Sequence, residues 1–153
     1  MDIEVLRLYC MDCKDWVVDK NTHRCPINHW VVADKIMVGV ATRLHERGIT
    51  PMTALWTSTE LEISYKYLLT LKIDIGRRIS DMVLGKLPSG WKYHWETVTP
   101  DRSELHMLGY TEHWYNLGFE DVGTRLETII KEFEEFLDTR DAVAKKAIIT
   151  LLG

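Results

Sequence analysis

The clearest pattern in the chain is an alternation of apolar and polar residues between positions 61 and 73. Every odd position there is apolar, and the even positions are mainly Glu, Ser, Lys and Thr. Because successive side chains of a strand point to opposite faces of a sheet, this pattern predicts a strand with one buried face. Residues 52–57 can pair with it across a turn near residues 58–60, which predicts a first antiparallel hairpin.

Residues 91–98 and 104–111 show the same alternation on either side of the polar segment 99–103. An antiparallel register that pairs even with even positions places the apolar residues of both strands on one face. This second hairpin then has a polar face, on which we expect four residues to gather: His94, Glu96, Glu104 and His106.

Helical periodicity is clearest between residues 30 and 47, where apolar residues recur every three or four positions. Gly48 followed by Ile49 predicts a left-handed cap at the end of this helix, with its usual hydrophobic contact. Before it, the alternation at residues 3–9 suits a short strand.

Two further helices are expected in the second half of the chain. Asp74 can cap a helix over residues 75–87, which Pro88 and the following glycine stop. Residues 122–137 show an apolar stripe within an acidic helix, and we expect a break near residues 138–139 before a terminal helix.

This order of elements predicts an α+β fold in one domain that covers residues 1–153. We expect a two-layer sandwich in which a four-stranded antiparallel sheet carries helices on one face. It resembles a circularly permuted ferredoxin-like arrangement. The alternative is another strand order in the same two-layer sandwich.

Composition and charge narrow the class of protein. The net charge is −4, and residues 119–141 hold eight acids against three bases, so a nucleic-acid partner is disfavoured. The acidic stretch is typical of a solvated helix face, with a docking surface for a basic partner as the alternative. No apolar run approaches the length of a membrane span and the amino terminus does not resemble a secretory signal, so we expect a cytoplasmic protein.

The segment 10–29 carries all three cysteines of the chain and two of its six histidines. Cys10 and Cys13 have the C-x2-C spacing that presents two thiolates to one ion, and a tetrahedral zinc site needs two more ligands. The segment therefore holds a candidate structural zinc site, with Cys10, Cys13, Cys25, His29 and His23 as candidate ligands.

Cys25-Pro26 resembles the second knuckle of a zinc ribbon, although Asn28 stands where a ribbon carries its fourth cysteine. A histidine must then complete the site, and His29 is slightly preferred over His23. Three ordinary reduced cysteines, or a redox-active C-x2-C pair, are the alternatives.

The polar face of the second hairpin suggests a different chemistry. Two imidazoles and two carboxylates on one face can ligate a metal or act as general acid and base, with His94 or His106 as base and Glu96 as orienting partner. A solvated sheet face explains the same residues, and the chain contains no motif for a catalytic nucleophile.

Our first hypothesis is a small binding or regulatory domain, with a structural zinc site at its amino terminus and a protein partner. A small metal- or histidine-dependent hydrolase-like enzyme is the alternative. A zinc-containing nucleic-acid binder is the third hypothesis, with phosphate contacts from Lys66, Lys72, Lys92 and Arg102. The apolar carboxyl terminus favours a homodimer, through the terminal helix or the open sheet face.

Overall fold

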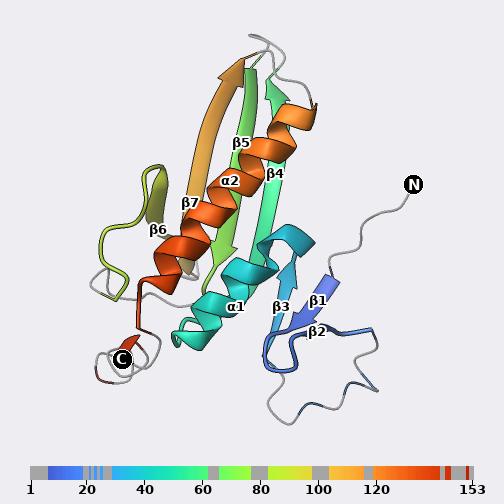
Figure 1. Ribbon diagram of the computed structural model, residues 1–153, viewed down its shortest axis with the longest axis vertical. Coiled ribbons are helices and arrows are strands. Elements are labelled where there is room, and N and C mark those ends of the chain that lie inside the picture. The colour runs from blue at the N-terminus through green and yellow to red at the C-terminus, as the bar shows by residue number, and fades with distance from the viewer. Residues whose placement is uncertain are drawn as a thin grey trace.

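The computed structural model describes residues 7–18, 21, 23, 25, 29–61, 66–76, 83–97, 104–115, 119–141, 144, 145 and 151, and the structural statements below concern these residues. Figure 1 shows their arrangement. In chain order the elements are β1 (Arg7–Cys10), β2 (Asp15–Trp16), β3 (Trp30–Ala33), the 3-10 turn η1 (Lys35–Met37), α1 (Val38–Glu46), β4 (Thr53–Leu61), β5 (Lys66–Asp74), β6 (Trp91–Thr97), β7 (Glu104–Tyr115) and α2 (Phe119–Asp138).

The described strands form one seven-stranded mixed sheet in the order β2-β1-β3-β4-β5-β7-β6. Strand β3 runs parallel to β4, and the other neighbours are antiparallel. The α+β class is therefore confirmed, but the expected four-stranded, permuted ferredoxin-like sheet is wrong. The amino-terminal segment supplies the difference, because β1, β2 and β3 extend the sheet beyond the two predicted hairpins.

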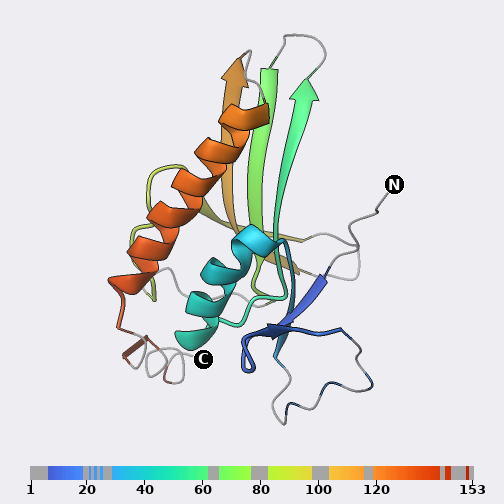
Figure 2. The same ribbon diagram turned by 45° about the vertical axis from the view of Figure 1, so that its right-hand side comes forward.

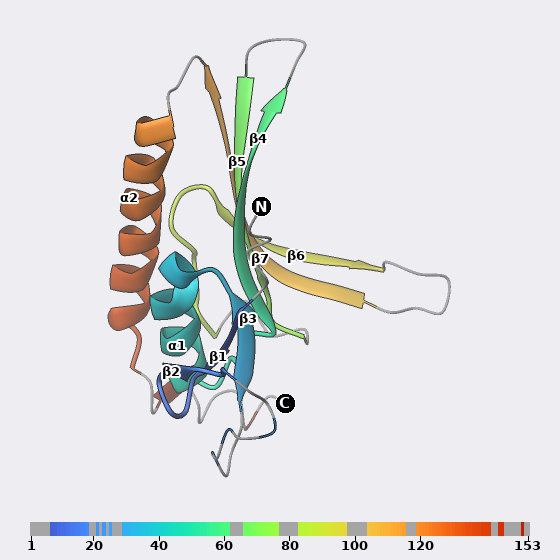
Figure 3. The ribbon, with the colours of Figure 1, turned by 90° about the vertical axis from the view of Figure 1, so that its right-hand side faces the viewer.

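Helices α1 and α2 lie side by side on one face of this sheet (Figures 1 and 2). Seen from the side, β6 and the first part of β7 turn away from the main sheet and project on the face opposite the helices (Figure 3). Gly109 lies within β7, opposite Lys72 of β5 and Lys92 of β6. A glycine inside a strand is typical of such a bend. Among the described helices, none is long and apolar enough to span a membrane.

The alternation at residues 61–73 correctly predicts that odd positions of β5 face the core. Leu69, Leu71 and Ile73 of β5 are fully buried, and Lys72 between them is exposed. Strand β4 continues to Leu61, so the expected turn at residues 58–60 is wrong.

The expected register of the second hairpin is also wrong. Strand β6 pairs odd with even positions of β7, with Tyr93 opposite Leu108. The cause lies in β5, where Leu71 pairs with Tyr110 and Ile73 pairs with Leu108. Even positions of β7 must therefore face the core.

The first helix begins later than its periodicity suggests. Residues 30–33 form β3, and α1 starts only at Val38 after the 3-10 turn. Its end is as predicted, because Gly48 has a φ of 85° and the amides of Gly48 and Ile49 donate to the carbonyls of His45 and Leu44. Ile49 is buried, which supplies the hydrophobic contact of the cap.

The first predicted strand and the predicted helices of the second half of the chain are confirmed only in part. Residues 7–9 of the first predicted strand lie in β1, and residues 3–6 are outside the described residues. The acidic helix is present as α2, which ends at Asp138 as expected. Residues 83–87 are turn and coil rather than helix, and residues 77–82 lie outside the described residues. The terminal helix also lies largely outside them.

Ion pairs join the two helices. Gly39 leaves room for the Glu134 carboxylate, whose Oε2 lies 2.7 Å from Arg43 Nη1, and Arg43 Nε donates to Asp138 Oδ1 at 2.8 Å. The buried Arg47, which follows α1, donates to the carbonyl of Arg43 in α1 and to that of Arg140, just beyond the end of α2. These contacts hold the helical layer together at one end.

Side chains of α2 anchor this layer to the sheet. Phe133 is fully buried, and its ring centroid lies 4.1 Å from that of Trp91 on β6. Arg125 forms a bidentate pair with Glu112 of β7, which also accepts a hydrogen bond from the Tyr110 hydroxyl. Burial, and next the Glu112 carboxylate, raise the pKa of Tyr110.

One variant on each face of the sheet tests which face is buried. Leu71→Ala is expected to lower the free energy of unfolding by about 2–5 kcal/mol, because it empties a fully buried site. Thr111→Ala, on the exposed face of β7, is expected to cost less than about 1 kcal/mol. Urea denaturation measures both, and equal costs for the two variants would contradict this arrangement.

Candidate metal centres

The C-x2-C pair lies in the tight turn that joins β1 to β2. Cys10 ends β1 and Cys13 lies in the turn, where its amide donates to Cys10 Sγ at 3.4 Å. Lys14 has a φ of 57°, and its amide donates to the Cys10 carbonyl at 2.8 Å. The left-handed residue closes the turn so that both sulfur atoms face the same side, and we call residues 10–13 the knuckle.

Two more potential ligands reach the knuckle from the segment that precedes β3. One ligand atom from each of Cys10, Cys13, His23 and Cys25 lies within 4.8 Å of every other. Cys13 Sγ is 3.7 Å from His23 Nε2, and the His23 ring packs edge-on against Trp30 with centroids 5.7 Å apart. The structure therefore brings together three sulfurs and one imidazole, which is a Cys3His set.

Burial and electrostatics differ among these ligands. Cys10 and Cys25 are buried, whereas Cys13 is exposed. The neighbouring sulfurs of Cys25 and Cys10 raise the pKa of Cys13 to about 12. Three crowded thiols resist becoming thiolates together unless a cation shares their charge, and a bound zinc ion deprotonates its thiol ligands.

His29 lies elsewhere. Its Nδ1 is 3.0 Å from Asp12 Oδ2, and its amide donates to the same oxygen at 2.9 Å. His23, rather than the preferred His29, thus completes the cysteine cluster, and this corrects the sequence-based choice. Spacing along the chain does not decide which of the two histidines is the fourth ligand, because that depends on how the chain folds after the knuckle.

Asp12 also contacts a histidine of α1. Its Oδ1 is 2.9 Å from His45 Nε2, and His45 Nδ1 is 2.9 Å from the Thr50 hydroxyl. Ligand atoms of Asp12, His29 and His45 lie within 4.8 Å of one another, so these residues form a second cluster. Burial alone would raise the pKa of Asp12, but hydrogen bonds from the His29 amide and the His45 ring outweigh it, and that pKa is lowered.

Sequence reasoning missed this second cluster. Asp12 lies between Cys10 and Cys13 but is not among the ligands that the sequence predicts, and His45 lies 33 positions further along the chain. The one available signal was the position of His45 in the last turn of a predicted helix, close to its cap. Nothing in the spacing showed that this helix end lies beside the knuckle.

The four residues proposed for acid–base chemistry do not share a face. His94 is paired with Met107, and His106 is paired with Trp95. Residues directly opposite in an antiparallel pair share a face, so His94 and His106 point to opposite faces. His94 is exposed and His106 is buried. Glu96 and Glu104 lie opposite Leu105 and Thr97, and their side chains are outside the described ones.

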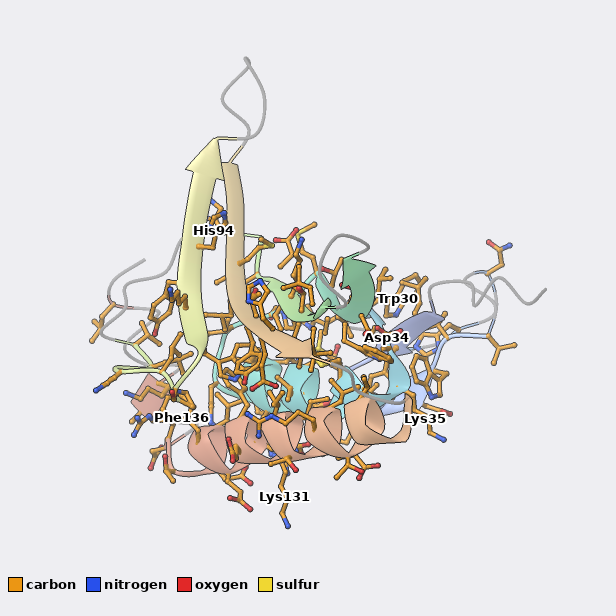
Figure 4. The ribbon with its side chains drawn as sticks, turned by 90° about the horizontal axis from the view of Figure 1, so that it is seen from above. Trp30, Asp34, Lys35, His94, Lys131 and Phe136 are labelled. Carbon is orange, nitrogen blue, oxygen red and sulfur yellow. The ribbon has the colours of Figure 1, made fainter. Side chains whose placement is uncertain are left out.

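The open sheet face instead carries a basic hollow of about 580 Å³ where the hairpin bends. Lys72 and Lys92 flank Gly109, and His94 lines the same hollow. Figure 4 shows His94 on the projecting hairpin, far from Lys131, which points away from the sheet on the outer side of α2. The side chain of Lys66 and all of Arg102 lie outside the described part of the chain.

Comparisons with protein-family models, with curated proteins and with solved structures found no match to this chain.

The opposite placement of the two histidines predicts unequal effects of their removal. His106→Ala is expected to lower the free energy of unfolding by about 1–3 kcal/mol, because the side chain is buried. His94→Ala is expected to cost less than about 0.5 kcal/mol, since that side chain is exposed. A double-mutant cycle measured by urea denaturation should show additive costs, whereas strong coupling would mean that the two rings meet.

Proposed function

We propose that the chain is a small binding or regulatory domain whose amino-terminal edge is held by one structural zinc ion. The observation that supports this proposal most directly is the convergence of four ligand atoms, from Cys10, Cys13, His23 and Cys25, within 4.8 Å. Cys3His is one of the usual ligand sets of structural zinc, and four protein ligands leave no position for water or substrate.

The location of the cluster explains what the ion contributes. Strands β1 and β2 are short, and their hairpin forms one edge of the sheet. A short two-stranded ribbon has little stability of its own in water. An ion that ties the knuckle to His23 and Cys25 would fasten this hairpin to a part of the chain outside it.

The two alternatives for the cysteines have less support. Ordinary buried cysteines have no reason to converge with a histidine, and Cys13 is exposed. A redox-active C-x2-C pair is typical of the start of a helix. Here the pair lies in a turn between two strands.

Metal analysis and two ligand variants test the zinc proposal. The purified protein is expected to hold about one tightly bound zinc ion per chain. Cys13→Ser and His23→Ala should each release it and lower the midpoint of thermal unfolding by about 5 °C or more. Neither substitution empties a fully buried site, so the loss would report the ion rather than packing.

His113→Ala is the matched control, because His113 is an exposed histidine on β7 outside the cluster. It should leave zinc content and thermal stability unchanged. Cobalt substitution adds a direct readout, since thiolate ligands give an intense sulfur-to-cobalt absorption that Cys13→Ser should weaken. A reduced protein that shows no such absorption and no loss of stability on chelation would overturn the proposal.

The hollow on the open sheet face supports a second, more specific role, which is binding of a small anion. Lys72 of β5, Gly109 of β7 and Lys92 of β6 lie in one row across the hollow. Gly109, between the two lysines, carries no side chain. A Cβ at Gly109 would meet only the Leu71 carbonyl, at 3.9 Å, so the space between the lysines is open. Thr70 and Thr111, directly opposite each other, add hydroxyl donors.

Phosphate-bearing ligands suit this surface because lysine ammonium groups and hydroxyls are their usual partners. The one described acid on this face of β5 is Asp74, and its Oδ1 accepts a hydrogen bond from the Gly76 amide. Seven of the 23 acids of the chain lie on α2, in the other layer. A local positive field is therefore retained despite the net charge of −4.

Titration with pyrophosphate, followed by NMR, tests the anion proposal. The double variant Lys72→Gln/Lys92→Gln is expected to weaken binding by about tenfold or more. Lys131→Gln, which removes one lysine charge from the outer side of α2, should leave the affinity unchanged. Equal affinities in the two variants would overturn a specific site. Tight oligonucleotide binding with a steep salt dependence would favour the nucleic-acid alternative instead.

The proposed homodimer, through the terminal helix or the open sheet face, and the cytoplasmic location both stay predictions. Leu151 is 85% exposed, so this apolar side chain is available for contact with another subunit.

A further inference from the structure

We propose that Asp12, His29 and His45 form a second metal site, which takes a divalent first-row transition metal ion and leaves coordination positions open to water. This site is separate in its ligands from the zinc site proposed above, although Asp12 lies within the knuckle. The juxtaposition of one carboxylate with two imidazoles from different elements carries the inference.

The ligand atoms are already close to the spacing that an ion requires. Ligands at about 2.1 Å from a tetrahedral ion lie about 3.4 Å from one another. Asp12 Oδ1 is 2.9 Å from His45 Nε2, Asp12 Oδ2 is 3.0 Å from His29 Nδ1, and no pair of ligand atoms exceeds 4.8 Å. The two imidazole rings lie with centroids 4.7 Å apart. Small side-chain rotations are enough to close the site around an ion.

Backbone structure presets these three side chains. Asp12 is fixed by the tight turn of the knuckle, and its Oδ2 accepts the His29 amide at 2.9 Å. His29 directly precedes β3, and its carbonyl accepts the Met11 amide. His45 lies in the last turn of α1. The site therefore joins three separate elements, which gives it a defined shape before any ion binds.

His45 also has the hydrogen bond that metal-ligating histidines usually make. Its Nδ1 lies 2.9 Å from the Thr50 hydroxyl, while Nε2 faces Asp12. Without an ion, Nε2–H can donate to Asp12 while Nδ1 accepts from the Thr50 hydroxyl. An ion would replace that Nε2 proton, and Nδ1–H would then donate to Thr50, so that His45 keeps its supporting hydrogen bond in the metal-bound form.

Exposure distinguishes this site from the cysteine cluster. The His29 side chain is 44% exposed, and those of His45 and Asp12 are 15% exposed. Three protein ligands are typical of open sites, in which water or substrate completes the shell. Two histidines and one carboxylate form the ligand set of many iron(II) and manganese(II) sites, whereas thiolates select zinc. The two clusters thus differ in the ions that they prefer.

Manganese titration of the zinc-loaded protein provides the test. Mn²⁺ competes poorly for thiolates, so it reports the nitrogen and oxygen ligands alone. We expect about one Mn²⁺ per chain, detected as loss of the free-ion EPR signal. Enhanced relaxation of water protons should accompany it, because the open positions hold exchanging water. Co²⁺ serves as a second probe, and its binding here should add no sulfur-to-cobalt absorption.

His29→Ala is the most informative variant, because it removes an exposed ligand ring and keeps the amide that supports Asp12. It should weaken Mn²⁺ binding by about tenfold or more, and His45→Gln should do the same. His113→Ala, an exposed histidine outside both clusters, should bind Mn²⁺ as the unaltered protein does. Circular dichroism and zinc content confirm that each variant is folded.

Equal binding of Mn²⁺ and Co²⁺ in the His29→Ala variant and the control would overturn the second site. So would a failure of both ions to bind at millimolar concentration while the protein keeps its zinc, which would make the triad a hydrogen-bonded contact only. Zinc loss in Cys13→Ser is measured separately. Failure of the second site can therefore be distinguished from failure of the zinc site.

Discussion

Burial of one face of the sheet beneath α1 and α2 is the constraint on which the other features depend. Leu69, Leu71 and Ile73 point into this layer, and Phe133 of α2 meets Trp91 across it. Because side chains alternate along a strand, burying these residues leaves Thr70 and Lys72 on the other face. The basic hollow lies on this other face, where Lys72 and Lys92 stand on either side of Gly109. The hairpin of β6 and β7 projects on the same side of the sheet (Figure 3).

The amino-terminal edge of the sheet is held in a different way. Strands β1 and β2 are short, and polar contacts of the turn between them add to the packing of Tyr9 and Trp16 against the core. Asp12 links the knuckle to the start of β3 through His29 and to the end of α1 through His45. The position of the knuckle thus depends on polar contacts between one carboxylate and two imidazoles, the same groups on which the proposed second metal site rests.

Sequence patterns predicted the parts of the fold that depend on local periodicity. The parity of β5, the Gly48 cap and the end of α2 at Asp138 follow from side-chain alternation, backbone sterics and the apolar stripe. The register of β6 with β7 did not follow, because β7 has apolar residues at both parities. Its pairing with β5 settles which of them face the core. Likewise β3 was hidden inside a helical pattern, since four apolar residues suit either structure.

The same distinction applies to the candidate sites. The C-x2-C spacing identified Cys10 and Cys13 because both ligands come from one turn, which local sequence encodes. The choice of His23 over His29, and the meeting of Asp12 with His45, depend on how distant segments pack. One turn thus presents two sets of potential ligands, since its sulfur atoms lie near His23 and Cys25 and its carboxylate contacts His45 of α1. An ion held by the sulfurs would fix the turn that aims Asp12, so the closed site would preorganise the open one.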